Sequence, residues 1–185
     1  LVKTKGSSDF VKQIDDALLA FADDWFVREM TLYLKRVLKR LDVTSRTLIG
    51  VIEPGSCFVG TLLEMALSCD QIFMLDGEYE GNPLPPAEIL LTKMNFGCYP
   101  MVNGISRLAS RFLSQPASVD ALQERCEETL NARAAAAAGL VTFTPDDIDW
   151  DDEIRITVES RASFSPDALT GMEANLRFAG PETVE

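Results

Sequence analysis

Histidine is absent from the 185 residues of the chain. Its absence excludes catalytic triads built on histidine, histidine-ligated zinc and imidazole acid–base chemistry. Basic residues are also scarce, with 17 Lys and Arg against 29 Asp and Glu, so the formal net charge is −12. A chain of this charge is repelled by a phosphate backbone, and we expect no nucleic-acid partner. Any catalysis must use carboxylates, cysteine, tyrosine, lysine or backbone amides.

Long apolar runs and closely spaced cysteines are lacking as well. No run reaches the roughly 18 apolar residues of a membrane-spanning helix, and no signal peptide is recognisable. We therefore expect a cytoplasmic chain with no membrane partner. The four cysteines include no pair separated by two residues, which excludes the common zinc and redox motifs. In a domain with an ordinary core they are expected to be buried thiols rather than disulfides.

What is present is typical of a folded α/β domain. Apolar residues make up 46% of the chain and charged residues 25%. A long helical periodicity is followed by alternating β-prone and helical segments, which predicts an α/β architecture. The expected helices cover residues 14–41, 60–68, 102–113, a segment after Pro116, the alanine run before Gly139 and a segment after Ser165; the expected strands cover 1–4, 47–52, 71–75 and 140–143. Residues 76–88 are expected to form a loop, and the acids of 146–153 to begin a helix rather than to hold a metal.

Residues 52–70 carry the most informative pattern. A buried strand meets a Pro-Gly turn and leads into a helix with Gly60 near its start. Free N–H groups at a helix N-terminus form an electropositive pocket, and such amides stabilise an oxyanion when aimed at a thioester carbonyl. Glu64 lies one turn further on and could face the same pocket, although a glutamate at this position is also typical of an exposed helix surface.

The spacing of Gly60, Glu64 and Cys69-Asp70 after a strand, together with the later element of residues 138–141, resembles the crotonase (enoyl-CoA hydratase/isomerase) superfamily. The resemblance implies a crotonase-like spiral of ββα units over residues 1–145 and a helical C-terminal extension over 146–185. It also implies that Gly60 and the amide of Thr61 form an oxyanion and substrate-binding site for an acyl-CoA thioester.

Longer strings resemble one family of this superfamily, the benzoyl-CoA-dihydrodiol lyases or 2,3-epoxybenzoyl-CoA dihydrolases. These strings cover residues 25–29, 41–46, 52–58, 95–108 and 165–182. The resemblance implies a C–C lyase of aerobic benzoate degradation, which hydrolytically opens 2,3-epoxybenzoyl-CoA to an open-chain CoA semialdehyde and formate. CoA is then part of the substrate, and neither a metal nor a redox cofactor is needed. The family combines two crotonase-like halves in one longer polypeptide that is expected to form homo-oligomers, such as dimers. This chain resembles the second half, and the preceding half is its expected partner.

Several positions depart from the superfamily pattern. Only the first glycine of the usual triplet is kept in Gly60-Thr61-Leu62, and the first oxyanion loop, residues 7–10, lacks its Gly-Ala pair. Lys93 stands where a second acid is usual, and Glu88 is out of register. One carboxylate without a partner is a poor acid–base pair for moving the elements of water. We therefore expect this half to be mainly structural.

The catalytic alternatives depend on few residues. If this half binds a thioester, the Thr61 amide is the expected oxyanion donor and Glu64 the expected acid–base group. Glu53 is the next candidate, because an acid directly after a buried strand is unusual; otherwise it is a carboxylate of the turn. Ser56 and Cys57 lie on the same turn, but a nucleophile there lacks an activating base.

Two other functions remain open at this point. A stand-alone enoyl-CoA hydratase or isomerase requires a second usable acid near Glu88. A non-catalytic dimerisation module predicts a filled pocket at Gly60 and an exposed apolar face around Trp25 and Phe26.

Overall fold

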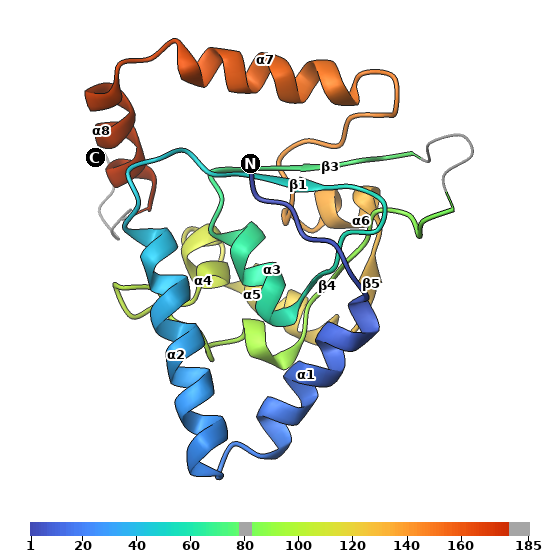
Figure 1. Cartoon of the computed structure of the whole chain (residues 1–185), viewed down its shortest axis with the longest axis vertical. Coiled ribbons are helices and arrows are strands. Elements are labelled where there is room, and N and C mark those ends of the chain that lie inside the picture. Colours follow the sequence, from blue (N-terminus) through green and yellow to red (C-terminus); the bar gives the residue numbers. More distant parts are fainter. Residues whose placement is uncertain (78–82, 178–185) are drawn as a thin grey trace.

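The computed structural model describes residues 1–77 and 83–177 of the chain. In this part, short strands alternate with helices around a small central layer of strands (Figure 1). The helices are α1 (Ser8–Ala20), α2 (Trp25–Asp42), α3 (Gly60–Leu67), the 3-10 turn η1 (Lys93–Asn95), α4 (Arg107–Arg111), α5 (Ala117–Glu124), α6 (Ala132–Ala137), α7 (Trp150–Ala162) and α8 (Pro166–Arg177). The strands are β1 (Ile49–Ile52), β2 (Phe58–Val59), β3 (Gln71–Met74), β4 (Ile89–Leu90) and β5 (Thr129–Leu130).

The strands form two small sheets. β1 and β3 are parallel, with Ile49 opposite Gln71. In the second sheet β2 runs parallel to β4, and β4 pairs antiparallel with β5. Residues 1–4 and 140–143 were predicted as strands, but each contributes only a single bridge, Val2 to Gly50 and Phe143 to Phe73. A helix between β1 and β3 allows the parallel pairing, because parallel strands need a long crossover connection.

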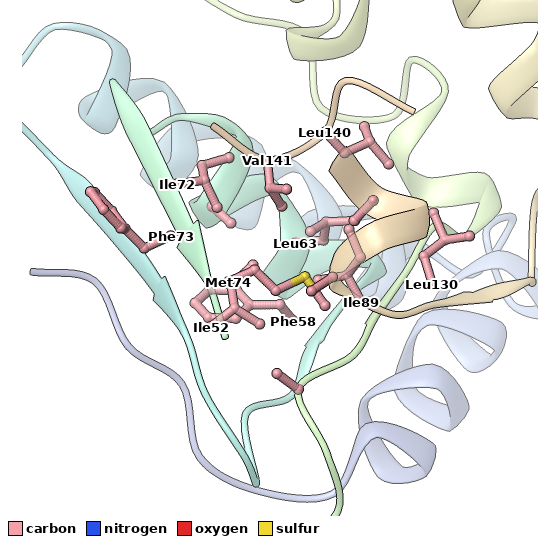
Figure 2. Packing of buried hydrophobic residues seen from close by; sticks show 14 of the residues in the cluster. Ile52, Phe58, Leu63, Ile72, Phe73, Met74, Ile89, Leu130, Leu140 and Val141 are labelled. Atoms are coloured by element: carbon pink, nitrogen blue, oxygen red, sulfur yellow. The ribbon is translucent and has the colours of Figure 1, made fainter. Parts of the chain in front are cut away.

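The main core lies between the two sheets and α3. Figure 2 shows side chains from both sheets, α3 and residues 140–141 meeting in one cluster. Its members include Ile52, Phe58, Leu63, Ile72, Met74, Ile89, Leu130 and Leu140, all at most 2% exposed. Since α3 packs inside this core, its N-terminal end is held rigidly below the strands.

Helices α1 and α2 form a hairpin beside α3 (Figure 1). The sequence pattern predicted one helix through residues 14–41, and this prediction is wrong at 21–24. The Asp24 side chain accepts hydrogen bonds from the amides of Phe26 and Val27, so a new helix begins there instead of the first one continuing. The inner faces of the hairpin supply Leu18 and Leu38, which pack with Met94 and Tyr99 in a second cluster.

Other boundaries follow identifiable local signals. The helix predicted for residues 102–113 is present only as the short α4, because Gly104 adopts φ +90° and Ser106 caps the helix just before Arg107. α6 ends at Ala137, and its C-cap Ala138 is followed by Gly139 at φ +71°. The predicted loop over residues 76–88 lies partly outside the described residues.

The C-terminal helices are those expected from the acids of residues 146–153 and from Ser165-Pro166. In Figure 1, α7 runs on the side of β1 and β3 opposite to α3, and the buried Trp150 anchors its first turn. The division of the chain at residue 145 stays a prediction, and residues 178–185 of the expected extension lie outside the described part. Among the described helices, none has both the length and the apolar character required to cross a membrane.

Candidate functional site

The N-terminal end of α3 places Gly60 and Thr61 against α1. Gly60 has φ +46°, a left-handed conformation that favours glycine. A Cβ atom at this position would also overlap the Asp15 carboxylate and the Thr92 hydroxyl. The glycine therefore allows both the turn into α3 and the close approach of Asp15.

The Thr61 amide, the predicted oxyanion donor, donates to a carboxylate of the chain itself. Its N–H lies 2.9 Å from Asp15 Oδ2, which also accepts from Thr92 Oγ1 at 3.2 Å. Thr61 Oγ1 donates to Asp15 Oδ1 at 2.5 Å, and Tyr99 Oη lies 3.1 Å from the same hydroxyl. Because the Thr61 proton points to Asp15, the Tyr99 hydroxyl donates to Thr61. We call Asp15, Thr61, Thr92 and Tyr99 the Asp15 cluster.

Asp15 is fully buried, and no basic side chain of the described residues forms an ion pair with it. Burial raises the pKa of Asp15 above its ordinary value of 3.8, against the opposing effect of the hydrogen bonds from Thr61 and Thr92. Partial positive charge at the start of α3 supports the carboxylate. When Asp15 is ionised, its hydrogen-bond donors among the described residues are neutral amide and hydroxyl groups.

Glu64 lies one turn further along α3, in a buried ion-pair network. Its Oε1 accepts from Asn95 Nδ2 at 2.7 Å, and its Oε2 accepts from Arg107 Nη1 at 2.8 Å. Arg107 Nη2 donates to Asp42 Oδ1 at 2.8 Å and to the Leu38 carbonyl at 3.1 Å. We call Asp42, Glu64, Asn95 and Arg107 the Arg107 cluster. Its three charged members are each about 2% exposed, so one guanidinium serves two buried carboxylates.

Burial dominates the electrostatics of this second cluster. It raises the pKa of Glu64 and that of Asp42, while the attraction of Arg107 opposes the rise in both cases. Both Glu64 oxygens already have partners and the side chain is 2% exposed. In this arrangement Glu64 stabilises Arg107 and Asn95 instead of facing an open pocket.

The two clusters form one continuous polar network. Asn95 Nδ2 donates to the Gly60 carbonyl at 2.9 Å as well as to Glu64, and Asn95 Oδ1 accepts from the Thr92 amide at 3.0 Å. The Tyr99 carbonyl accepts from Arg107 Nη1 at 3.1 Å. Residues 92–99 therefore connect the N-terminal end of α3, with the amide of Thr61 (its amide end), to Glu64 one turn further along.

The other candidate residues lie elsewhere. Glu53 follows β1 and pairs with Lys3 at 3.0 Å, and its side chain forms neither a hydrogen bond nor an ion pair with Thr61 or Glu64. Glu88 borders a separate cavity of about 110 Å³ together with Lys12 and Thr129. The structure thus brings Gly60, Thr61 and Glu64 together and leaves both other acids outside. Their catalytic roles stay predictions.

The cysteines and potential metal ligands offer no second centre. All four cysteines are free thiols, with Cys57 and Cys69 buried. Burial raises the pKa of Cys69 to about 12, which leaves its thiol protonated and unreactive at neutral pH. Within residues 1–77 and 83–177, no group of three acids or cysteines is placed to hold a metal ion.

Sequence reasoning missed three charged residues of the two clusters, namely Asp15, Asp42 and Arg107. One signal was available for the acids. Asp15 lies four residues after Val11 and three before Leu18, and Asp42 lies four after Leu38, so both acids occupy the inward stripe of an amphipathic helix. A buried acid on such a stripe requires partners. Arg107 belongs to a string that carried the family resemblance, but nothing in the sequence paired it with Glu64.

Solved structures with a similar arrangement are acyl-CoA enzymes by name. An enoyl-CoA hydratase/carnithine racemase from Magnetospirillum magneticum matches with a TM-score of 0.63 and 20% identity, over 88% of this chain and 57% of its own. A methylmalonyl CoA decarboxylase, solved in complex with 2S-carboxypropyl CoA, matches with a TM-score of 0.57 and 17% identity, over 82% of this chain and 54% of its own. The chain has the crotonase fold. This confirms the fold class predicted from Gly60, Glu64 and the alternation of elements.

Sequence similarity is more specific than the crotonase fold. The chain is 49% identical over 183 residues to the benzoyl-CoA-dihydrodiol lyase of Aromatoleum evansii. The match covers 99% of this chain and 32% of the lyase, so the chain spans about a third of that protein's length. No family model matches the chain. The predicted resemblance to the benzoyl-CoA-dihydrodiol lyases is confirmed.

Proposed function

We infer that the chain is the second crotonase-like half of a lyase that hydrolytically opens 2,3-epoxybenzoyl-CoA, and that this half is mainly structural. The reaction would give an open-chain CoA semialdehyde and formate in benzoate degradation. The 49% identity to a benzoyl-CoA-dihydrodiol lyase supports the substrate class. The partner of this half would be the preceding half of the same polypeptide, in a cytoplasmic homo-oligomer.

The single observation that carries the structural role is the contact between Asp15 and Thr61. An oxyanion donor must present its N–H to the carbonyl oxygen of the thioester. Here the Thr61 N–H already donates to Asp15 Oδ2 at 2.9 Å, inside a fully buried cluster. A thioester oxygen and this carboxylate would compete for the same proton. Binding a thioester here would therefore require the displacement of a buried anion.

The environment of Glu64 supports the same role. An acid–base group must exchange a proton with the substrate, usually with the help of a second positioned acid. Glu64 is held by Asn95 and Arg107, and the other carboxylate on this guanidinium, Asp42, is tied by its own ion pair. Lys93, at the position of the second acid, is exposed at the start of η1. The catalytic acids of the reaction would then lie in the preceding half.

Replacing Glu64 in the complete lyase polypeptide tests this proposal. Under the structural role, Glu64→Gln lowers ring-opening turnover no more than Asp42→Asn, which damages the same Arg107 cluster from its other side. Under an acid–base role, Glu64→Gln alone costs roughly 10²–10⁴-fold in turnover. Such a difference between the two variants would contradict the proposal. Calorimetry of the 185-residue chain with benzoyl-CoA is expected to show no saturable binding.

A second candidate function is a non-catalytic dimerisation module, and the outer face of α2 favours it. Phe26, Met30, Tyr33 and Val37 recur every three or four residues along this face and are 43–62% exposed, and Trp25 beside them is 74% exposed. Large exposed apolar patches mark interaction sites. Sedimentation of the chain with Tyr33→Glu tests this function, with Gln13→Glu on α1 as the charge-matched control. The module predicts that only Tyr33→Glu shifts the chain toward monomer.

A stand-alone hydratase or isomerase has less support. It requires a second acid beside Glu64, and Glu88 lines a different cavity. Turnover of a simple enoyl-CoA by the isolated chain would support a stand-alone hydratase or isomerase.

A further inference from the structure

Asp15 is an unusual buried anion. Buried charges in proteins are ordinarily paired with a charge of opposite sign, because burial without a partner is very costly. Arg107 provides such a partner to Glu64 and Asp42, whereas the donors to Asp15 among residues 1–77 and 83–177 are hydroxyl and amide groups. The surroundings of Asp15 thus resemble those of a bound anionic ligand more than those of an ion pair.

The donors reach both oxygens of the carboxylate. The Thr61 amide and the Thr92 hydroxyl donate to Oδ2, and the Thr61 hydroxyl donates to Oδ1. This arrangement fits a planar group with two acceptor oxygens. Tyr99 Oη lies 3.1 Å from Thr61 Oγ1 and orients this hydroxyl toward Asp15.

These donors are held in place by contacts that do not involve α1. The Thr92 amide is bound to Asn95 Oδ1, the Met94 amide donates to Thr92 Oγ1 at 3.2 Å, and Asn95 Nδ2 holds the Gly60 carbonyl. The donor set belongs to α3, η1 and Tyr99, while Asp15 enters it from a separate helix. Such a preorganised set keeps its shape when the Asp15 side chain is removed.

We propose that Asp15 is an internal ligand, a plug supplied by α1 that closes the amide end of α3 against thioesters and other external anions. The overlap that a Cβ at Gly60 would make with the same carboxylate shows how closely the plug is seated. This inference rests on the proposed structural role of this half and supplies its physical cause. It predicts that the site accepts a small free carboxylate once the plug is absent.

Formate added to the Asp15→Gly chain tests the plug. The matched control is Asp16→Gly, which puts glycine at the neighbouring exposed position of α1 and opens no space at Thr61. Potassium chloride at equal ionic strength controls for salt. We expect Asp15→Gly to melt at a lower temperature than Asp16→Gly. We also expect formate at ten times its Kd to raise the Tm of Asp15→Gly by about 3–5 °C, and to leave the wild type and Asp16→Gly unchanged.

Titration of ¹³C-formate followed by NMR measures the same binding directly. Saturable binding should appear for Asp15→Gly and be absent for the wild type. Adding Thr92→Val to Asp15→Gly removes one donor and should weaken formate binding about tenfold, the equivalent of one hydrogen bond to a charged group. Asp15→Ala, which retains good helix propensity, is used in the same titration if the glycine variant does not fold.

Equal formate responses of Asp15→Gly and Asp16→Gly would overturn the proposal. So would the absence of saturable binding to both Asp15→Gly and Asp15→Ala. These outcomes are independent of turnover by Glu64→Gln, so the plug and the structural role of this half can fail separately.

Discussion

The Asp15 cluster and the Arg107 cluster stabilise buried carboxylates in different ways. Both bury carboxylates beside α3, and both use residues 92–99 as partners. The Arg107 cluster neutralises two acids with one guanidinium, whereas the Asp15 cluster stabilises one acid with neutral donors at a helix N-terminus. The first arrangement is typical of a structural ion pair, and the second of an anion site that is filled.

The difference predicts how much stability is lost when a charged side chain is removed from each cluster. Removing the cation of the Arg107 cluster leaves the buried carboxylates of Asp42 and Glu64 without a partner of opposite charge. Removing the anion of the Asp15 cluster leaves neutral donors that water or a small anion can reach. The first loss should therefore be the larger one, and a ligand should repair only the second.

Arg107→Met should have the largest effect. It leaves Glu64 and Asp42 buried without a cation, and breaking a buried pair in this way costs about 3–5 kcal/mol. Arg133→Met is the matched control, because Arg133 pairs with Asp76 at the surface and its side chain is 83% exposed. That control should lower stability by less than about 1 kcal/mol. Urea unfolding of both variants gives the comparison, and equal losses would show that the Arg107 cluster carries little stability.

Gly60→Ala should have the next largest effect, and it examines the other cluster. The added methyl group overlaps the Asp15 carboxylate and is attached to a residue at φ +46°. Together these should cost about 2–4 kcal/mol in the free energy of unfolding. Gly97→Ala separates the two causes, because Gly97 also has positive φ, at +109°, but no atom lies within 4 Å of its Cβ position.

A double variant sharpens this comparison. If the overlap with Asp15 dominates, Gly60→Ala combined with Asp15→Gly should cost at least about 0.5 kcal/mol less than the two single losses together. Strict additivity would mean that the carboxylate is not seated against Gly60.

Local patterns were sufficient to predict α3 and the strands on either side of it. Continuous apolar runs with turn residues between them specify buried strands, and the Gly60 helix begins and ends close to the predicted residues. The break between α1 and α2 was missed, because the apolar periodicity continues across it. One capping side chain, Asp24, decides where the second helix starts.

The site was predicted only in part, because its partners are distant in sequence. Gly60, Thr61 and Glu64 were found from a local motif. Asp15 lies 46 residues before Thr61, and Arg107 lies 43 residues after Glu64. No local period connects residues so far apart. The placement of an acid on the inward stripe of α1 indicates burial, but it does not name the donors that receive it.

The pH dependence of stability should give the smallest effect and the finest distinction between the clusters. Burial raises the pKa of Asp15 above 3.8, so the folded chain takes up this proton at a higher pH than the unfolded chain does. The contribution of Asp15 to stability therefore grows as pH falls through the raised pKa toward 3.8, and it is lost as pH rises. Asp15→Asn keeps the shape of the side chain but cannot titrate.

Subtracting the unfolding free energy of Asp15→Asn from that of the wild type isolates this group, because Asp16, Glu64 and the other acids titrate in both proteins. We expect the difference to shift in favour of the wild type as pH falls from 7 to 4, by about 1.4 kcal/mol for each unit by which the pKa is raised. Urea unfolding at four pH values measures it. A shift of opposite sign would mean that the donors of Thr61 and Thr92 outweigh burial. The donors at the amide end of α3 would then stabilise the Asp15 carboxylate without the help of an ion pair. The two clusters would differ in the geometry of their hydrogen-bond donors instead of in charge.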